Sequence, residues 1–244
     1  MIRLGVTGTD TGVGKTTVSR ALLGLMRADG LRVSAMKPVE TGVVIDDPSS
    51  DARALAAAAG TGAPMRDVCP IVLREPLAPW MAARRAGRTL TLHPLDESFH
   101  RLTRDIDAIV VEGAGGLLVP ITEADSYLTL FQRWSLDAVV VAANRLGVIN
   151  HTRLTVHTLR DAGVRVLGVV LNEIDGAAPD VARLTNYDAL QTLLPDTPVV
   201  SFPWLPSTAD DSSMAHGAAA SGLRGVIARA APNRHHSAEG HPNR

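Results

Sequence analysis

The sequence predicts a doubly wound α/β domain, with a mostly parallel sheet and helices on both faces. Short apolar runs alternate along the chain with segments of helical periodicity, which is the pattern of strands joined by right-handed crossovers. Aromatic residues make up only 3% of the composition, so Ala, Val, Leu and Ile must build the core, as suits strands buried on both sides. The chain has 244 residues, and we expect one domain over residues 1–230.

The predicted elements begin with a strand and a helix. Leu4–Thr7 is a short apolar run, and Lys15–Ala28 carries Val18 and Leu22 on one helical face and stops before Gly30. The next predicted elements are a strand at Arg32–Met36, an alanine-rich helix at Asp51–Ala59, a helix at His93–Arg104 and a strand at Ile109–Val111.

The second half of the chain continues the alternation. Ala138–Ala142 combines small and β-branched residues, which is typical of a buried strand. The elements predicted after it are a helix at His151–Ala162, a strand at Val166–Leu171, a helix at Asp180–Leu194, a strand at Val199–Phe202 and a last helix at Ser213–Ala230. Ligands of such sheets bind at the carboxyl ends of the strands, so we expect the site at 7–16, 37–41, 112–116 and 172.

Composition excludes several classes of partner. The net charge of −1 gives no basic excess for phosphate-backbone contacts, so no nucleic acid is expected. Cys69 is the single cysteine, which excludes an internal disulfide. No signal-peptide pattern follows Met1, and the run Ala138–Ala143 is too short to span a bilayer, so we expect no membrane association and a cytoplasmic location. Residues 231–244 lack apolar periodicity and are expected to form a disordered tail.

The strongest motif is the glycine-rich segment Gly8–Thr16, which follows a predicted strand and opens a helix. This is the context of a P-loop, whose backbone N–H groups surround phosphate oxygens. Lys15 can reach the β- and γ-phosphates of a nucleotide, and the Thr16 hydroxyl suits Mg²⁺. Gly8 and the Gly14-Lys15 pair enclose five residues rather than the usual four, and Asp10 stands where partition-type ATPases carry a signature lysine. The motif indicates a P-loop NTPase-like fold.

Two charged residues follow other predicted strands and are expected to face this loop. Lys37 can stabilise charge on transferred phosphoryl or carboxylate oxygens, although a solvated lysine before a turn is the alternative. Glu112 occupies the position of a Mg²⁺-binding carboxylate, and the glycines after it permit close approach of a ligand; the alternative is a loop carboxylate. Asp51 can add a second carboxylate to the metal, but is equally suited to capping a helix.

At these positions the chain resembles the dethiobiotin synthetases. The resemblance covers residues 1 to about 210 and depends on four segments: Gly8–Thr16, Lys37–Gly42, Val111–Gly116 and Gly147–His151. It implies a homodimer with a seven-stranded parallel sheet, ATP and Mg²⁺ as co-substrate and metal, and 7,8-diaminopelargonic acid and CO₂ as substrates. A carbamate would be phosphorylated by ATP to a carbamic–phosphoric anhydride, and a second amine would then close a cyclic urea.

The resemblance also implies roles for individual residues. The triphosphate would be held by Gly12, Val13, Gly14, Lys15 and Thr16, with Gly113, Ala114 and Gly115 beside the nucleotide. Thr16, Asp51 and Glu112 would bind Mg²⁺, and Lys15 and Lys37 would be catalytic. Thr11 and Thr41 would touch the substrate, whose carboxylate would lie on the partner subunit near Ile149, Asn150 and Tyr187. The nucleoside would contact Asn172, Pro203, Trp204, Leu205 and Asp210.

This sequence departs from the family pattern at three positions. Glu173 follows Asn172 where Asn-Asp is common, Gly12 stands where some members carry Glu, and Thr41 replaces a serine. Two other readings remain open. A corrin-type amide synthetase would need a glutaminase domain, for which the chain is too short, and a partition-type nucleotide switch would need the lysine that Asp10 replaces.

Overall fold

The computed structural model describes residues 1–45, 47–206 and 211–230. Six parallel strands form the main sheet, in the order β2-β5-β1-β6-β7-β8. Their bounds are β1 Ile2–Gly8, β2 Val33–Met36, β5 Ala108–Gly116, β6 Asp137–Ala143, β7 Val166–Asn172 and β8 Val199–Phe202. The P-loop strand β1 is central, because it pairs with β5 on one side and β6 on the other.

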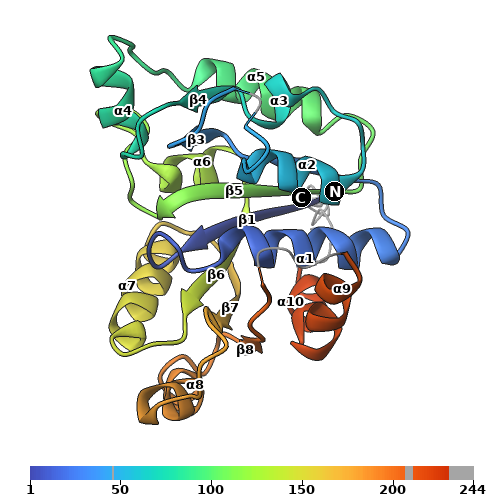
Figure 1. Cartoon of the computed structure of the whole chain (residues 1–244), viewed down its shortest axis with the longest axis vertical. Coiled ribbons are helices and arrows are strands. Elements are labelled where there is room, and N and C mark those ends of the chain that lie inside the picture. The colour runs from blue at the N-terminus through green and yellow to red at the C-terminus, as the bar shows by residue number, and fades with distance from the viewer. Residues whose placement is uncertain (46, 207–210, 231–244) are drawn as a thin grey trace, which may run out of the picture.

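Helices cover both faces of this sheet and create two apolar cores (Figure 1). One core contains side chains of the first helix, its neighbour α2 and the two C-terminal helices: α1 Lys15–Ala28, α2 Asp51–Ala59, α9 Asp211–Ala220 and α10 Leu223–Ala228. The other core is covered by α5 His93–Leu102, α6 Tyr127–Arg133, α7 Val148–Asp161 and α8 Val181–Leu193. Every residue of β7 is buried, as expected for a strand covered on both faces. The predicted doubly wound α/β fold is confirmed.

A second, two-stranded sheet lies beside the main one. Its parallel strands are β3 Val39–Thr41 and β4 Ile71–Leu73, and they lie near α3 Met65–Val68 and α4 Pro79–Arg85 (Figure 1). None of these four elements, nor α6, was predicted, because three to seven residues contain too little periodicity to recognise.

The structure corrects several predicted boundaries. The six strands expected from the apolar runs are all present, but the seven-stranded sheet implied by the resemblance is a sheet of six strands with a separate pair among the described residues. Strand β5 does not end at Glu112, because small residues let it continue to Gly116, which pairs with Gly8. The last predicted helix is divided at Gly222, which has a φ of 78°. Helix α7 begins at Val148 instead of His151.

Two expectations fall outside the described residues, namely the tail at 231–244 and the nucleoside contact of Asp210. Within the described ranges, the longest and most apolar helices are still too short or too polar to cross a bilayer.

Candidate active site

The P-loop connects the carboxyl end of β1 to the start of α1, and its glycines adopt conformations that other residues resist. Gly12 and Gly14 have φ values of 73° and 88°. A Cβ atom on Gly14 would lie 2.1 Å from Nδ2 of Asn172, which itself donates a hydrogen bond of 2.9 Å to the carbonyl of Val13. The loop is therefore held against the end of β7, and its last glycine directly precedes the helix N-terminus that suits a phosphate group.

Lys15 folds back over the loop. Its side chain is largely buried, and its ammonium donates a hydrogen bond of 3.1 Å to the carbonyl of Asp10. Burial, assisted by the positive charge of Lys37, lowers the pKa of Lys15 to about 8. A bound triphosphate would supply the negative charge that restores its ordinary preference for the protonated form.

Lys37, Glu112, Asp51 and Thr16 meet below the loop. The Lys37 ammonium lies 2.6 Å from Glu112 Oε1 and 2.9 Å from Asp51 Oδ2. The Thr16 hydroxyl donates a hydrogen bond of 2.8 Å to the same Glu112 oxygen. Four side chains from β5, the β2–β3 connection and the first turns of α1 and α2 thus converge.

The electrostatics of this cluster depend on its burial. Burial alone would disfavour the charged form of Lys37, but Glu112 and Asp51 outweigh it and hold its pKa above the ordinary value. Burial would likewise raise the pKa of Asp51, yet the charge and hydrogen bond of Lys37 keep it below its usual range. Lys37 and Asp51 therefore stay ionised, and the Lys37 ammonium lies between the carboxyl groups of Asp51 and Glu112.

The same cluster has the chemistry of a magnesium site. Its oxygens come from a hydroxyl and two carboxylates, the hard ligands that Mg²⁺ prefers. Glu112 Oε2 is buried and has no hydrogen-bond partner among the described residues, which leaves one carboxylate oxygen able to accept an ion or an ion-bound water. The predicted metal-binding residues Thr16, Asp51 and Glu112 therefore fit the ion.

A cavity of about 770 Å³ opens onto this cluster and gathers many of the predicted residues. The predicted residues that line it are Thr11, Gly12, Gly14, Lys15, Thr16, Lys37, Thr41, Asp51, Ala114 and Gly115. Val13, Glu112 and Gly113 are buried and do not line it. Its remaining lining includes Val43, Val119 and the segment 76–79, which were not predicted, and Glu40, which lies in the expected segment 37–41 but had been given no role. Glu40 is the most informative of these, since it lies inside the Lys37–Gly42 motif as a polar residue beside a strand end.

Other predicted residues lie outside this cavity. Asn172 ends β7, and the following strand β8 leads into Pro203, Trp204 and Leu205, whose side chains pack near Gly176 and Gly217. These residues lie at the carboxyl ends of β7 and β8 and in the segment that follows β8. Ile149 and Asn150 lie in the first turn of α7, and Tyr187 on α8 accepts a hydrogen bond of 2.7 Å from Gln191.

Glu173, the departure from the family pattern, is engaged elsewhere. Its carboxylate accepts a hydrogen bond of 3.0 Å from Arg183 Nε and another of 2.5 Å from the Asn144 amide. Arg183 also binds Asp175 at 2.7 Å and so closes the loop between β7 and α8. Glu173 therefore stabilises this loop, a role that the sequence did not reveal.

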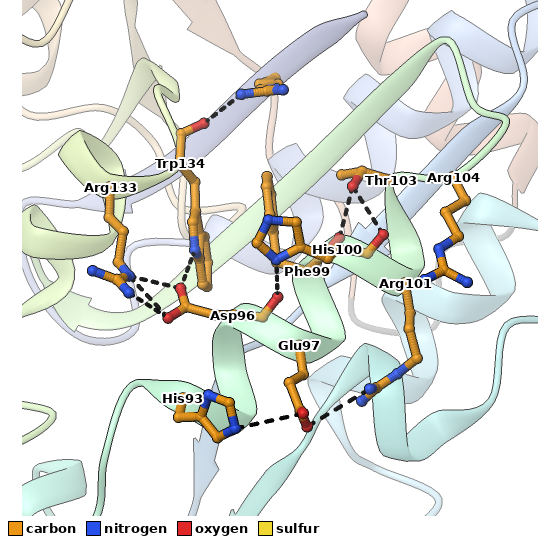
Figure 2. Close-up of a pocket in the computed structure, with 11 residues that line it drawn as sticks. His93, Asp96, Glu97, Phe99, His100, Arg101, Thr103, Arg104, Arg133 and Trp134 are labelled. Atoms are coloured by element: carbon orange, nitrogen blue, oxygen red, sulfur yellow. Dashed lines mark hydrogen bonds and ion pairs between the residues drawn. The ribbon is translucent and has the colours of Figure 1, made fainter.

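A second cavity, of about 800 Å³, is lined by α5, the end of α6 and Arg3 of β1 (Figure 2). Asp96 accepts hydrogen bonds from Arg133 Nε at 2.7 Å and Trp134 Nε1 at 2.8 Å, and the Trp134 ring stacks on Phe99 at 4.5 Å. Arg101, on the same helix as Asp96, forms an ion pair with Asp67. Because these charges are already paired with each other, we assign them the structural role of joining α5 to α6 and α3.

Comparisons with known proteins agree with this geometry. A protein-family profile described as an AAA domain matches residues 3–212. Among solved structures, the cell division ATPase MinD of Pyrococcus furiosus aligns with a TM-score of 0.52 at 18% identity, over 94% of this chain and 99% of that one. A ParA family ATPase from Chlorobium tepidum TLS aligns at 0.51 and 12% identity, over 96% and 94%. These two likenesses show a shared fold.

Sequence comparison is more specific. The ATP-dependent dethiobiotin synthetase BioD of Anaeromyxobacter dehalogenans (strain 2CP-C) is 42% identical over 214 residues, which are 84% of this chain and 92% of that protein. The protein of the same description from Ralstonia nicotianae is 40% identical over 75% of this chain and 82% of its own length. That from Bacillus licheniformis is 38% identical over 76% and 79%. The chain belongs to the ATP-dependent dethiobiotin synthetase family.

Proposed function

We propose that the chain forms dethiobiotin from 7,8-diaminopelargonic acid, CO₂ and ATP, acting as a carbon–nitrogen ligase in the cytoplasm. The observation that carries this proposal is the cluster of Lys37, Glu112, Asp51 and Thr16 beside the P-loop, of which Lys37, Asp51 and Thr16 line one cavity. Such a cluster can gather a triphosphate and a second anion at one sheet edge, which phosphoryl transfer to a carbamate requires.

None of the steps of the reaction requires a nucleophile from the protein. One amine of the substrate adds to CO₂ and loses a proton, which yields a carbamate. A carbamate oxygen then attacks the γ-phosphorus of ATP, the bond to ADP breaks, and a carbamic–phosphoric anhydride forms. The second amine attacks the carbonyl carbon, phosphate leaves, and a proton is released as the cyclic urea closes. Burial raises the pKa of the Cys69 thiol to about 12, so the single cysteine stays protonated and serves no nucleophilic role.

The two lysines would provide the charge stabilisation. Lys15 would contact the β- and γ-phosphates, and Lys37 would stabilise the carbamate and the transferred phosphoryl group. Thr16, Asp51 and Glu112 would hold Mg²⁺, which neutralises charge on phosphate oxygens when it is bound. Thr11 and Thr41 line the cavity and would orient the substrate by their hydroxyl groups.

The nucleoside would lie along the carboxyl ends of β7 and β8. We assign its contacts to Asn172 and to Pro203, Trp204 and Leu205, with Asp210 further along the same segment. Support comes from the position of Asn172, which is buried against the P-loop and keeps Oδ1 without a partner among the described residues. An adenine amino group is a donor that could satisfy this oxygen.

We infer that two copies assemble and that the substrate carboxylate is bound by the partner's Ile149, Asn150 and Tyr187. These three do not line the chain's own cavity, while the amides of a helix start suit a carboxylate. Large apolar side chains are also exposed near α7 and α8, with Leu146 at 85%, Leu154 at 59% and Leu184 at 65% exposure. An apolar surface of this kind is typical of a protein–protein interface.

The decisive experiment measures ADP release with the diamine and bicarbonate omitted in turn. We expect release to require both, and mass spectrometry to detect dethiobiotin in the complete mixture. ATP hydrolysis that is indifferent to the diamine would contradict the proposal and would favour a partition-type switch instead.

A further inference from the structure

Glu40, in the short strand β3, has a buried carboxylate whose two oxygens are both used within the protein. The Ser50 hydroxyl donates a hydrogen bond of 2.6 Å to Oε2, and the backbone N–H of Asp51 donates one of 2.6 Å to Oε1. The backbone N–H of Ala52 adds a longer bond of 3.3 Å to Oε2. Glu40 is 5% exposed, so little solvent competes for these interactions.

These donors are the start of helix α2. The first N–H groups of a helix have no partner within the helix, and the helix dipole places a partial positive charge there. Ser50, the N-cap residue, accepts a bond of 3.4 Å from the N–H of Arg53 and so satisfies a later group. Glu40, in β3, accepts hydrogen bonds from the two N–H groups that precede that of Arg53, namely those of Asp51 and Ala52. A carboxylate from another segment therefore fixes where α2 begins.

Asp51 is held at both its backbone and its side chain. The same residue that donates its N–H to Glu40 sends its carboxylate to the Lys37 ammonium at 2.9 Å. Lys37 and Glu40 belong to one short segment, because Lys37 directly precedes Pro38 and β3. Within this segment, Glu40 binds the backbone of Asp51 and Lys37 binds its side chain. Displacement of the α2 start would therefore move Asp51 away from Lys37 and Glu112.

We propose that Glu40 is a positioning residue that holds Asp51 where it can bind Mg²⁺. The inference rests on the proposed function, in which Asp51 is a ligand of the ion. Partners behind a metal ligand typically contribute 10- to 100-fold to metal affinity by fixing its orientation. The two-stranded sheet β3–β4 would then support the metal site, because its pairing holds the strand that carries Glu40.

The test compares Glu40→Gln with the matched variant Asp107→Asn, next to the main sheet. Asp107 also accepts three hydrogen bonds, from the N–H, Nε and Nη2 of Arg32, but it lies at the amino end of β5. Both substitutions remove the charge of a carboxylate that organises backbone and side-chain donors. Only the first is next to the proposed metal site.

Two readouts are measured on the full chain. Binding of Mn²⁺, a spectroscopic substitute for Mg²⁺, is followed by electron paramagnetic resonance in the presence of a non-hydrolysable ATP analogue, and thermal unfolding is followed by circular dichroism. We expect Glu40→Gln to weaken Mn²⁺ binding about tenfold, and Asp107→Asn to leave it unchanged even where the melting temperature falls. Ser50→Ala, which removes one donor to Glu40, should weaken Mn²⁺ binding to a smaller extent. Wild-type Mn²⁺ affinity in Glu40→Gln, with only the melting temperature lowered, would overturn the positioning role.

Asp51→Asn separates this inference from the proposed function. Weaker Mn²⁺ binding in Asp51→Asn together with wild-type binding in Glu40→Gln would reject the positioning role alone. Unchanged binding in Asp51→Asn would reject the metal site and the positioning role with it. Diamine-dependent ADP release by the wild-type protein tests the catalytic proposal independently of either variant.

Discussion

The Lys37 ammonium lies 2.6 Å from Oε1 of Glu112, whose side chain is completely buried. Strand pairing explains this contact: β2 and β5 are parallel and place Met36 opposite Val111, so the next residues of both segments, Lys37 and Glu112, meet where β2 ends. Asp51 joins the pair from α2. The positive charge of Lys37 is thereby held close to the P-loop.

Lys37→Ala should abolish turnover while ATP binding changes much less, because Lys37 acts on the transferred group and the P-loop holds the nucleotide. Loss of one preorganised charge of this kind lowers kcat by about 100- to 1,000-fold. Steady-state ADP release and calorimetric ATP binding measure the two effects. Wild-type turnover in this variant would reject a catalytic role for Lys37.

The same variant should also be less stable. Removing one partner of a buried ion pair costs about 3–5 kcal/mol, because the remaining charge is left uncompensated. A Lys37→Ala, Glu112→Gln double variant should recover part of the loss, as measured by urea denaturation. No recovery would show that the two side chains are not energetically coupled.

Thr16→Val should raise the Mg²⁺ concentration needed for half-maximal activity by about tenfold, because it keeps the side-chain shape but removes a hydroxyl assigned to the ion. Binding of ADP without Mg²⁺ serves as the control and should stay close to the wild-type value. An unchanged Mg²⁺ requirement would contradict the assigned metal site.

ATP binding should take up a proton near pH 8.5. The pKa of Lys15 is lowered to about 8 in the free protein, mainly by burial, so the amine is largely neutral above that pH. A triphosphate favours the ammonium form, raises this pKa and draws a proton from solution. Calorimetry in buffers of different ionisation enthalpy measures the uptake, and Lys15→Met should eliminate it. Affinity for ATP should accordingly fall as the pH rises through 8.

Lys15 also has a predictable effect on stability. Its pKa is lower in the folded state than its ordinary value of 10.5, so the unfolded chain binds more protons between about pH 8 and 10.5. The contribution of Lys15 to the free energy of unfolding must therefore increase with pH over that window. The difference between wild-type protein and Lys15→Met in urea denaturation at pH 7.5 and 9.5 isolates this contribution.

Gly14→Ala should destabilise the fold more than Gly163→Ala. Both glycines have positive φ values, 88° and 74°, so both variants carry a backbone strain of about 1–3 kcal/mol. Only the Gly14 variant adds a collision, because its Cβ would lie 2.1 Å from the Asn172 amide, whereas nothing lies within 4 Å at Gly163. Equal losses in denaturation experiments would show that the contact of Asn172 with the P-loop is not rigid.

Leu154→Asp should convert a dimer to a monomer, since it places a charge on an exposed apolar position of α7. Met81→Asp, at an exposed apolar position of α4, is the matched control and should leave the assembly intact. Sedimentation velocity distinguishes the two states. A wild-type protein that is already monomeric would contradict the proposed assembly.

Much of the fold was predictable because local apolar runs and helical periodicity indicate its strands and helices. All six strands of the main sheet and the P-loop helix were expected, and Lys15–Ala28 and Asp51–Ala59 match their predicted bounds. The errors are concentrated in short or glycine-interrupted elements. A strand of three residues such as Val39–Thr41 forms only because β4 pairs with it, and the break at Gly222 depends on one positive φ angle.

Local patterns were enough to predict the alternation of strands and helices and a candidate phosphate-binding loop, because apolar periodicity and a glycine-rich loop before a helix are properties of neighbouring residues. Which distant groups meet depends on the packing of the whole fold. The pairing of Lys37 with Glu112 follows from the register of β2 on β5. The hydrogen bond from the Asp51 N–H to Glu40 follows from the placement of a separate small sheet. Such contacts are set by how strands and helices pack, and segments many residues apart carry no local signal of their final separation.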